Sequence, residues 1–204
     1  PLFNTPNTFK AILLGGGPVS ESLLKKASER RIPIVSSYGM TETCAQIIAN
    51  PLATPSGMYV PLKSVGTPFP PNEMEIRDDE GHAVGKNQSG QLWLHGPQVF
   101  DGYWDADENK DRFDEHGWFN TGDFGHINGF GHLFIETRRT DLIVTGGENV
   151  NPLEVEEAIK NLPSIKDAVV IGLPDEEWGQ KVTAVVTLKN GKTPDFSEIK
   201  SLLK

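Results

Sequence analysis

Cysteine is nearly absent from the sequence. Cys44 is the single cysteine, so the 204 residues cannot form a disulfide bond among themselves. A chain without disulfides is typical of a reducing compartment, and we expect a cytoplasmic protein. Because Cys44 follows Thr43 in a segment that we expect to be helical, it is interpreted as a small packing residue and not as a nucleophile.

Long apolar runs are absent as well. None approaches the roughly 20 residues that a membrane-spanning helix needs, so we expect no membrane insertion. Residues 1–6 lack the charged n-region of a signal peptide and resemble a chain entered in the middle.

Positive charge is scarce. The chain has 28 acidic and 19 basic residues, which gives a net charge of −9 at pH 7. A nucleic-acid-binding surface has to neutralise phosphates with Lys and Arg, so this balance argues against a nucleic-acid partner.

The five histidines share no helical ligand spacing, and no zinc site is expected. A hydrophobic content of 37% in a non-repetitive sequence indicates a globular protein of one large domain or two modest ones.

The stretch Ser36–Thr43, SSYGMTET, is the centre of the prediction. The β-branched run at 32–35 is typical of a buried strand, whereas residues 41–49 are expected to form a short helix that ends at Asn50–Pro51. Tyr38–Met40 is therefore interpreted as the loop between the carboxyl end of a strand and the amino end of a helix. Open α/β sheets bind ligands in the crevice at that position.

The residue types in this loop suit a nucleotide with Mg²⁺. Gly39 lets a ligand approach the backbone closely, and Tyr38 offers a flat face for a planar ring. Thr41 places a hydroxyl and amides where a helix start favours an anion, and Glu42 adds a carboxylate for a hard cation. The alternative is a core aromatic residue and a glutamate that interacts only with the helix dipole.

The residues ahead of this loop predict its neighbours in a sheet. An apolar run at 9–14 is expected to be a strand that ends on the turn GGGP at 15–18. A helix then begins at Ser20. Its apolar face is Leu23, Leu24 and Ala27. Strand, helix, strand and helix in this order predict a βαβα unit with a parallel sheet over residues 1–60. The glycine turn lies on the same rim as Tyr38, where it exposes backbone to a flat ligand; the alternative is an ordinary tight turn.

Period-two alternation replaces helical periodicity further on. Runs at 73–77, 90–96 and 130–136 predict an antiparallel, barrel-like sheet over residues 61–136. Between the second and third runs, Thr121-Gly122-Asp123 is interpreted as a turn. The carboxylate of Asp123 can accept two hydrogen bonds and suits a ribose diol, although an ordinary turn aspartate is the alternative.

The polar run 137–141 separates a second block. Here the sequence predicts a small α+β domain, built from a strand at 142–145, a turn at 146–149, a helix at 153–162 that follows Pro152, strands at 165–173 and 181–188, and a last helix from Pro194.

Taken together, these motifs resemble the adenylate-forming superfamily of acyl-CoA synthetases, luciferases and peptide-synthetase adenylation domains. Tyr38–Glu42, Thr121–Asp123, Arg138 and Gly146–Asn149 occur in that family's order and spacing. The amino-acid sequence of three segments looks most like that of the 2-succinylbenzoate–CoA ligases of menaquinone synthesis: residues 14–18, 38–46 and 141–149. The resemblance implies an α/β part and a β-barrel part of a large domain over 1–137, and the start of a small mobile α+β domain over 138–204.

The resemblance also implies the chemistry. ATP and a carboxylate would form an acyl-adenylate and pyrophosphate, and CoA would then displace AMP, so the expected cofactors are ATP or AMP, Mg²⁺ and coenzyme A. The implied nucleotide-binding residues are Gly15, Gly16, Gly17, Pro18, Tyr38, Gly39, Met40, Thr41, Asp123 and Arg138. Within this set Tyr38 would stack on adenine, Asp123 and Arg138 would hold the ribose, and the catalytic pair would be Thr41 at the α-phosphate and Glu42 on the metal. Gly146, Gly147, Glu148 and Asn149 would line the pantetheine channel, and Thr140 would be the hinge.

Some family features are missing or changed. Many members carry Asp at the position of Thr140 and Gly at the position of Thr137. Residues 1–204 contain neither the Ser/Thr/Gly-rich phosphate loop nor the late Gly-Lys of the family, so we expect a chain truncated at both ends that forms no acyl-adenylate by itself. The alternatives are a medium- or long-chain fatty acyl-CoA synthetase, an adenylation domain that loads a carrier protein, and a non-catalytic nucleotide-binding module.

Overall fold

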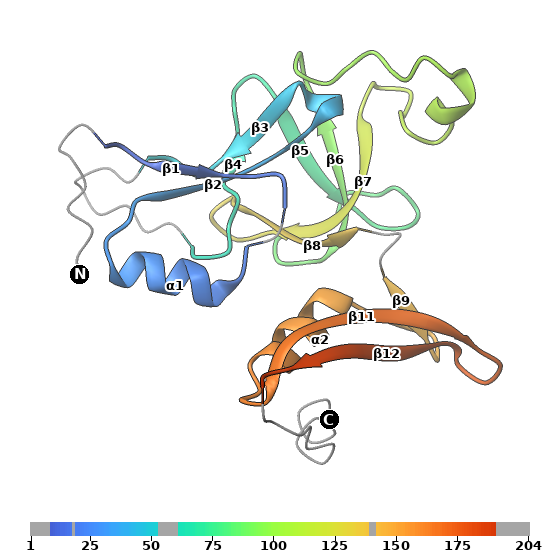
Figure 1. Cartoon of the computed structure of the whole chain (residues 1–204). Coiled ribbons are helices and arrows are strands. Elements are labelled where there is room, and N and C mark those ends of the chain that lie inside the picture. The colour runs from blue at the N-terminus through green and yellow to red at the C-terminus, as the bar shows by residue number, and fades with distance from the viewer. Residues whose placement is uncertain (1–8, 18, 53–60, 139–141, 191–204) are drawn as a thin grey trace. The chain divides into compact units, whose positions relative to one another are not determined.

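The computed structural model describes residues 9–17, 19–52, 61–138 and 142–190. These residues form two compact units, Pro1–Glu136 and Thr137–Lys204, and each unit is described by itself. Figure 1 shows the order of the helices and strands.

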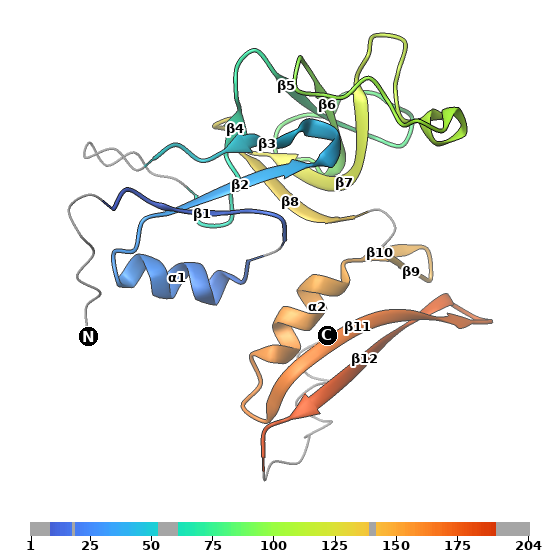
Figure 2. The ribbon, with the colours of Figure 1, turned by 45° about the horizontal axis from the view of Figure 1, so that its top comes forward.

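The first unit begins as the sequence predicts, with a strand, a helix and a parallel strand. The elements are β1 (Ile12–Leu14), α1 (Glu21–Glu29) and β2 (Ile34–Met40), and β1 pairs in parallel with β2. The side chain of Ser20 accepts a hydrogen bond from the Leu23 amide at 3.3 Å, which caps the helix start. Leu24 and Ala27 are buried, but Leu23, expected on the same apolar face, is about half exposed. Figures 1 and 2 show α1 along one side of β1 and β2.

The helix expected over residues 41–49 is wrong. Only Thr41–Thr43 form a single 3-10 turn, and β3 (Ala45–Ala49) then pairs antiparallel with β2. The chain reverses because Cys44 and Ala45 both have positive φ angles, 52° and 91°. Cys44 is consequently an exposed turn residue, and its interpretation as a packing residue is also wrong.

The burial of β3 explains this reversal. Ile47 and Ile48 are both fully buried, and burial of each contributes about 2 kcal/mol, more than the helix propensity of a short segment can offer. The Thr43 hydroxyl stabilises the turn, because it accepts from the Met40 amide at 3.0 Å and donates to the Ala45 carbonyl at 2.8 Å. The first sheet therefore has the order β1-β2-β3-β4, with β4 at Thr67–Pro68, and the expected βαβα unit is a βαββ unit.

The antiparallel sheet predicted for residues 61–136 is confirmed, with one strand more than predicted. Its strands, in the order β5-β6-β7-β8, are Glu73–Arg77, Gly90–His95, Phe119–Ile127 and Leu133–Arg138. The sequence Thr121-Gly122-Asp123 lies inside β7, so its interpretation as a turn is wrong. Gly122 has a φ of 78°, and the register between β6 and β7 shifts beside it, which marks an irregularity of the bulge type.

One apolar cluster joins the two sheets of the first unit. Its buried members come from β3 and from all four strands of the second sheet: Ile47, Ile48, Ile76, Leu92, Leu94, Ile127 and Leu133. Tyr38 packs against this cluster, and the amide of Leu133 donates to the Gly66 carbonyl at 2.8 Å. Through Tyr38, the end of β2 packs against the same core as Ile127 of β7.

The second unit is a small α+β sheet, as predicted. Its elements are β9 (Ile143–Thr145), β10 (Glu148–Val150), α2 (Pro152–Lys160), β11 (Ile165–Asp175) and β12 (Gly179–Leu188), in the sheet order β10-β9-β12-β11. Figure 2 shows α2 along the sheet, and fully buried Ile159 of α2 packs against Ile165, Ala168 and Val170 of β11. The expected turn over 146–149 comprises only Gly146 and Gly147, because Glu148 and Asn149 pair with β9. The helix expected from Pro194 lies outside the described residues.

Candidate functional site

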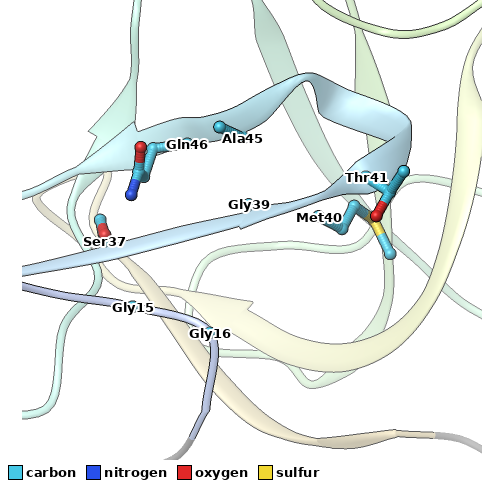
Figure 3. Close-up of a pocket in the computed structure, with 8 residues that line it drawn as sticks. All are labelled: Gly15, Gly16, Ser37, Gly39, Met40, Thr41, Ala45 and Gln46. Atoms are coloured by element: carbon cyan, nitrogen blue, oxygen red, sulfur yellow. The ribbon is translucent and has the colours of Figure 1, made fainter.

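An open cavity of about 410 Å³ lies where β1, β2 and β3 end or begin. It is lined by Gly15, Gly16, Ser37, Gly39, Met40, Thr41, Ala45 and Gln46 (Figure 3). The carboxyl ends of the parallel strands β1 and β2 meet here, which is where α/β sheets bind ligands. Two separately predicted segments, the glycine turn and the tyrosine stretch, thus share one cavity.

Two of the residues that line this cavity are glycines at positions where no larger side chain fits. A Cβ on Gly39 would run into the backbone carbonyl of Ala45, because β2 and β3 approach closely there. A Cβ on Gly15 would lie 2.7 Å from the hydroxyl of Ser37, which itself donates to the Leu14 carbonyl at 2.9 Å. Figure 3 shows the Gln46 amide reaching towards Ser37 across the same floor. Gly17 belongs to the turn without lining the cavity, and Pro18 lies outside the described residues.

Tyr38 and Asp123 are in direct contact although 85 residues separate them. The Tyr38 hydroxyl donates to Asp123 Oδ2 at 2.6 Å. Asp123 is 5% exposed and sits on β7. Thr121 places it, since the Thr121 hydroxyl accepts from the Asp123 amide at 3.1 Å and donates to the Leu92 carbonyl of β6 at 2.9 Å. The tertiary structure therefore brings the Tyr38 hydroxyl and the Asp123 carboxylate together, although neither residue is among those that line the cavity.

Glu42 lies in the turn after β2 and contacts a residue that sequence reasoning missed. The hydroxyl of Tyr103 donates to Glu42 Oε1 at 2.6 Å. Burial and the hydrogen bond to Glu42 raise the pKa of the Tyr103 hydroxyl to about 12, because both disfavour the phenolate. The available signal was an aromatic residue beside Gly102 in a turn-rich segment, which has no specific spacing to Glu42.

The anion site at Thr41 was expected because a helix was predicted to start there, and that helix is absent. The turn at Thr41–Thr43 has three residues, so no long helix dipole points at the cavity. The Thr41 hydroxyl remains available, since Thr41 lines the cavity and is exposed.

The donor set around the cavity suits a cation that is shared with a ligand. In the described part of the chain, no group of three or more His, Cys, Asp or Glu residues could hold a metal ion without help. Mg²⁺ commonly takes one or two protein carboxylates and completes its shell with water and substrate phosphates. One half-buried glutamate, Glu42, next to a ligand-sized cavity fits that pattern.

Arg77 holds the far end of the loop that carries Tyr103. Its guanidinium donates to Asp114 at 2.8 Å and to Glu75 at 2.9 Å, and lies 4.6 Å from the ring centre of Trp93 and 5.1 Å from that of Trp118. Burial alone would raise the pKa of Asp114, but hydrogen bonds from Arg77 and from the Trp118 amide outweigh it and lower that pKa. The loop between β6 and β7 is therefore fixed to the sheet at its end.

The Gly146–Gly147 turn of the second unit adjoins a tryptophan. Both glycines have positive φ angles, 59° and 87°. The Gly146 amide donates to the Trp178 carbonyl at 2.9 Å, and a Cβ on Gly146 would lie 2.7 Å from the Trp178 ring. Trp178 is 52% exposed, so its ring forms an accessible surface beside the turn. Sequence reasoning missed this tryptophan.

Two predicted site residues have side chains that lie outside the described part of the structure. Arg138 ends β8, and its side chain is outside the described part of the structure, as is Thr140 altogether. Within the described ranges, no helix has the length and apolar character that crossing a membrane requires.

Comparison with known proteins agrees with this geometry. The family model of AMP-binding enzymes matches residues 4–104, and the model of the AMP-binding enzyme C-terminal domain matches residues 154–204. The chain belongs to the AMP-binding, adenylate-forming enzymes.

Within the family, its curated relatives include 2-succinylbenzoate–CoA ligases. The one from Geobacillus kaustophilus is 39% identical over 199 residues, which are 98% of this chain and 40% of that protein. The one from Oceanobacillus iheyensis is 41% identical over 182 residues, 89% of this chain and 36% of that protein. The predicted resemblance is confirmed, and the chain spans about 40% of the length of these relatives.

Solved structures show the same relationship. The o-succinylbenzoate CoA synthetase of Bacillus subtilis in complex with its acyl-adenylate intermediate has a TM-score of 0.85 and 35% sequence identity, over 98% of this chain and 40% of that one. The same enzyme in complex with ATP and a magnesium ion has a TM-score of 0.82 with the same coverage.

Proposed function

We propose that the protein is an AMP-forming acid–CoA ligase of the cytoplasm. It activates a carboxylate with ATP as the acyl-adenylate and transfers the acyl group to CoA, and the acid is 2-succinylbenzoate. The contact between Tyr38 and Asp123 carries this proposal, because the neighbours of Tyr38 in β2, Ser37 and Gly39, line the cavity together with Thr41. It unites a stacking ring and a ribose acceptor at one place, which is what a nucleoside monophosphate requires.

The nucleotide is bound by residues of the first unit. The adenine ring lies against Tyr38, and the ribose hydroxyls donate to the Asp123 carboxylate, which accepts two hydrogen bonds well. Gly15, Gly16 and Gly39 leave room for the flat edge of the base and for the acyl group. Arg138 is proposed as a second ribose contact.

Charge on the α-phosphate limits the first half-reaction, because the attacking carboxylate is also an anion. The Thr41 hydroxyl donates a hydrogen bond to a phosphate oxygen. Glu42 is the carboxylate that would hold Mg²⁺, and the ion, when bound, neutralises phosphate charge as the pyrophosphate leaves. The buried surroundings of Asp123 keep the ribose in one place, so that the α-phosphorus stays within reach of the acid.

Acyl transfer is assigned to the second unit. We propose that residues 1–137 belong to the large domain and that residues 138–204 belong to the small domain, with Thr140 as the hinge. The turn at Gly146–Gly147 and the first residues of β10, Glu148 and Asn149, line the pantetheine channel. Two glycines leave space for a thin chain, and the exposed ring of Trp178 forms a wall beside it.

Replacing Gly146 with alanine should slow thioester formation about 10-fold or more while pyrophosphate release changes by less than about 2-fold. The new methyl group would displace the Trp178 ring, and alanine also disfavours the φ of 59°. Gly147→Ala is the comparison variant, because Gly147 also has a positive φ, 87°, but a Cβ there meets no atom within 4 Å. Equal losses for both variants would show that the Trp178 contact contributes nothing.

The function is tested with the protein at its full natural length. Pyrophosphate release, AMP and acyl-CoA are measured with ATP, Mg²⁺ and CoA for 2-succinylbenzoate, benzoate and fatty acids. We expect thioester formation with 2-succinylbenzoate at least 100-fold faster than with the others, because an acid that matches the pocket is favoured in the transition state.

Three results would contradict this proposal. Preference for a fatty acid would indicate a fatty acyl-CoA synthetase, and acyl transfer only to a carrier protein would indicate an adenylation domain. Binding of AMP in a calorimeter without acid-dependent pyrophosphate release would indicate a non-catalytic module. Residues 1–204 tested by themselves are expected to release no pyrophosphate, because they lack the Ser/Thr/Gly-rich loop and the late lysine.

A further inference from the structure

Tyr103 reaches the predicted metal ligand from a distant loop. It lies between β6 and β7, 61 residues from Glu42, and its hydroxyl donates to Glu42 Oε1 at 2.6 Å. The same loop makes a second contact, because the amide of Phe100 donates to the Glu42 carbonyl at 2.9 Å. Backbone and side chain of one glutamate are thus bound by one loop.

The loop is built to keep Tyr103 in place. The side chain of Asn109 binds both backbone groups of Tyr103: its Oδ1 accepts from the Tyr103 amide at 2.7 Å, and its Nδ2 donates to the Tyr103 carbonyl at 3.0 Å. Gly102 permits this contact, since its φ is 134° and a Cβ there would lie 2.8 Å from Asn109 Oδ1. The ring of Phe100 packs edge-to-face on the Tyr103 ring, with centroids 4.9 Å apart.

The donor and the acceptor of the hydrogen bond between Tyr103 and Glu42 are fixed by their chemistry. The carboxylate oxygen of Glu42 can only accept, so the Tyr103 hydroxyl is the donor across the 2.6 Å contact. Oε1 of Glu42 is therefore occupied by that proton. Oε2 accepts no hydrogen bond from any described residue, which leaves one carboxylate oxygen for a cation.

We propose that Tyr103 is a positioning residue for the metal site: it orients the Glu42 carboxylate so that Oε2 is the oxygen that binds the divalent cation of the metal–nucleotide complex. This inference rests on the proposed function, in which Glu42 holds the cation. The physical reason is that a free glutamate rotates among several side-chain conformers, whereas a hydrogen-bonded one is held in the binding conformer before the cation arrives. Residues that hydrogen-bond a metal ligand typically contribute about 10–100-fold in metal affinity.

The test replaces Tyr103 with phenylalanine in the full-length protein. Phenylalanine keeps the ring that packs on Phe100 and removes only the hydroxyl. Binding of Mn²⁺ is measured without turnover, from the free-ion signal in electron paramagnetic resonance, in the presence of α,β-methylene-ATP. We expect the dissociation constant of Mn²⁺ to rise about 10-fold. In the adenylation assay, the Mg²⁺ concentration for half-maximal rate should rise by the same factor, with the rate at saturating Mg²⁺ within about 2-fold of wild type.

Two further variants make the outcome decisive. Ser89→Ala is the matched control, because it removes another hydroxyl that donates to a carboxylate, Glu136 at 2.7 Å, and should leave Mn²⁺ binding unchanged. Glu42→Gln removes the ligand and should weaken binding at least as much as Tyr103→Phe. If Glu42→Gln weakens Mn²⁺ binding and Tyr103→Phe does not, the positioning role is wrong and the ligase proposal survives. If neither variant changes it, Glu42 is not the metal ligand and both assignments fail.

Discussion

Alanine at Gly39 should destabilise the first unit and abolish adenylation together. The added Cβ would meet the backbone carbonyl of Ala45, which cannot rotate away as a side chain can. The strands β2 and β3 would have to separate, yet β3 carries the fully buried Ile47 and Ile48. Overpacking of this kind costs about 2–3 kcal/mol, and we expect the melting temperature to fall by roughly 5–10 °C.

The effect on activity follows from the displacement of the cavity wall. Gly39 lies between Tyr38 and the cavity residue Met40 in the same strand, so a shift of about 1 Å misplaces the whole nucleotide surface and lowers the adenylation rate by about 100-fold or more. Gly129→Ala is the control, because a Cβ there meets no atom within 4 Å. An unchanged melting temperature for Gly39→Ala, measured by calorimetry beside this control, would mean that β2 and β3 do not approach as closely as described.

Alanine at Asp123 should lower kcat/KM for ATP about 100-fold. The substitution removes the proposed ribose acceptor and leaves the Tyr38 hydroxyl without its 2.6 Å partner. Hydrogen bonds to a charged group contribute about 1.5–3 kcal/mol each, and two to the ribose would exceed a factor of 100. Asp123→Asn keeps one acceptor oxygen and should lose less.

Substrate analogues separate a ribose role from a structural one. The wild-type protein should prefer ATP over 2′,3′-dideoxy-ATP, and Asp123→Ala should lose that preference, since the hydroxyls no longer have an acceptor. Tyr38→Phe removes the same protein hydrogen bond but keeps the Asp123 carboxylate, so it should retain the preference. If Asp123→Ala still discriminates against the dideoxy analogue as strongly as wild type, Asp123 does not bind the ribose.

Elements with strong local signals were predictable from the sequence. Ser20 followed by an apolar face predicts α1, and Asn151-Pro152 before a further apolar face predicts α2; both helices begin where their capping residues place them. Alternation at period two predicts β5 and β6 because alternate side chains enter one core. These sequence patterns involve residues that are close to each other along the chain, so the helices and strands can be predicted without knowing any distant contact.

The predictions for two segments were wrong because the structure of these segments depends on contacts with residues far along the chain. Residues 41–49 have no local feature that forbids a helix, and the burial of Ile47 and Ile48 against the second sheet makes them a turn and a strand. Thr121-Gly122-Asp123 has the composition of a turn. Its Gly122 instead accommodates an irregularity inside β7, where pairing with β6 supplies the hydrogen bonds.

The residue types of the site follow from the sequence: a tyrosine beside a glycine at the end of a strand, a glutamate shortly after it, and an aspartate far along the chain. Such side chains can be named from their chemistry, because stacking, metal binding and acceptance from a diol each need few groups. Which of these side chains come into contact depends on the packing of the sheets. The packing of β2 and β3 onto the second sheet brings Tyr38 to Asp123, and the loop held by Asn109 brings Tyr103 to Glu42. Tyr38 and Asp123 are 85 residues apart in the sequence, and Glu42 and Tyr103 are 61 residues apart. No local sequence pattern predicts these two contacts, because they depend on how whole sheets and loops pack.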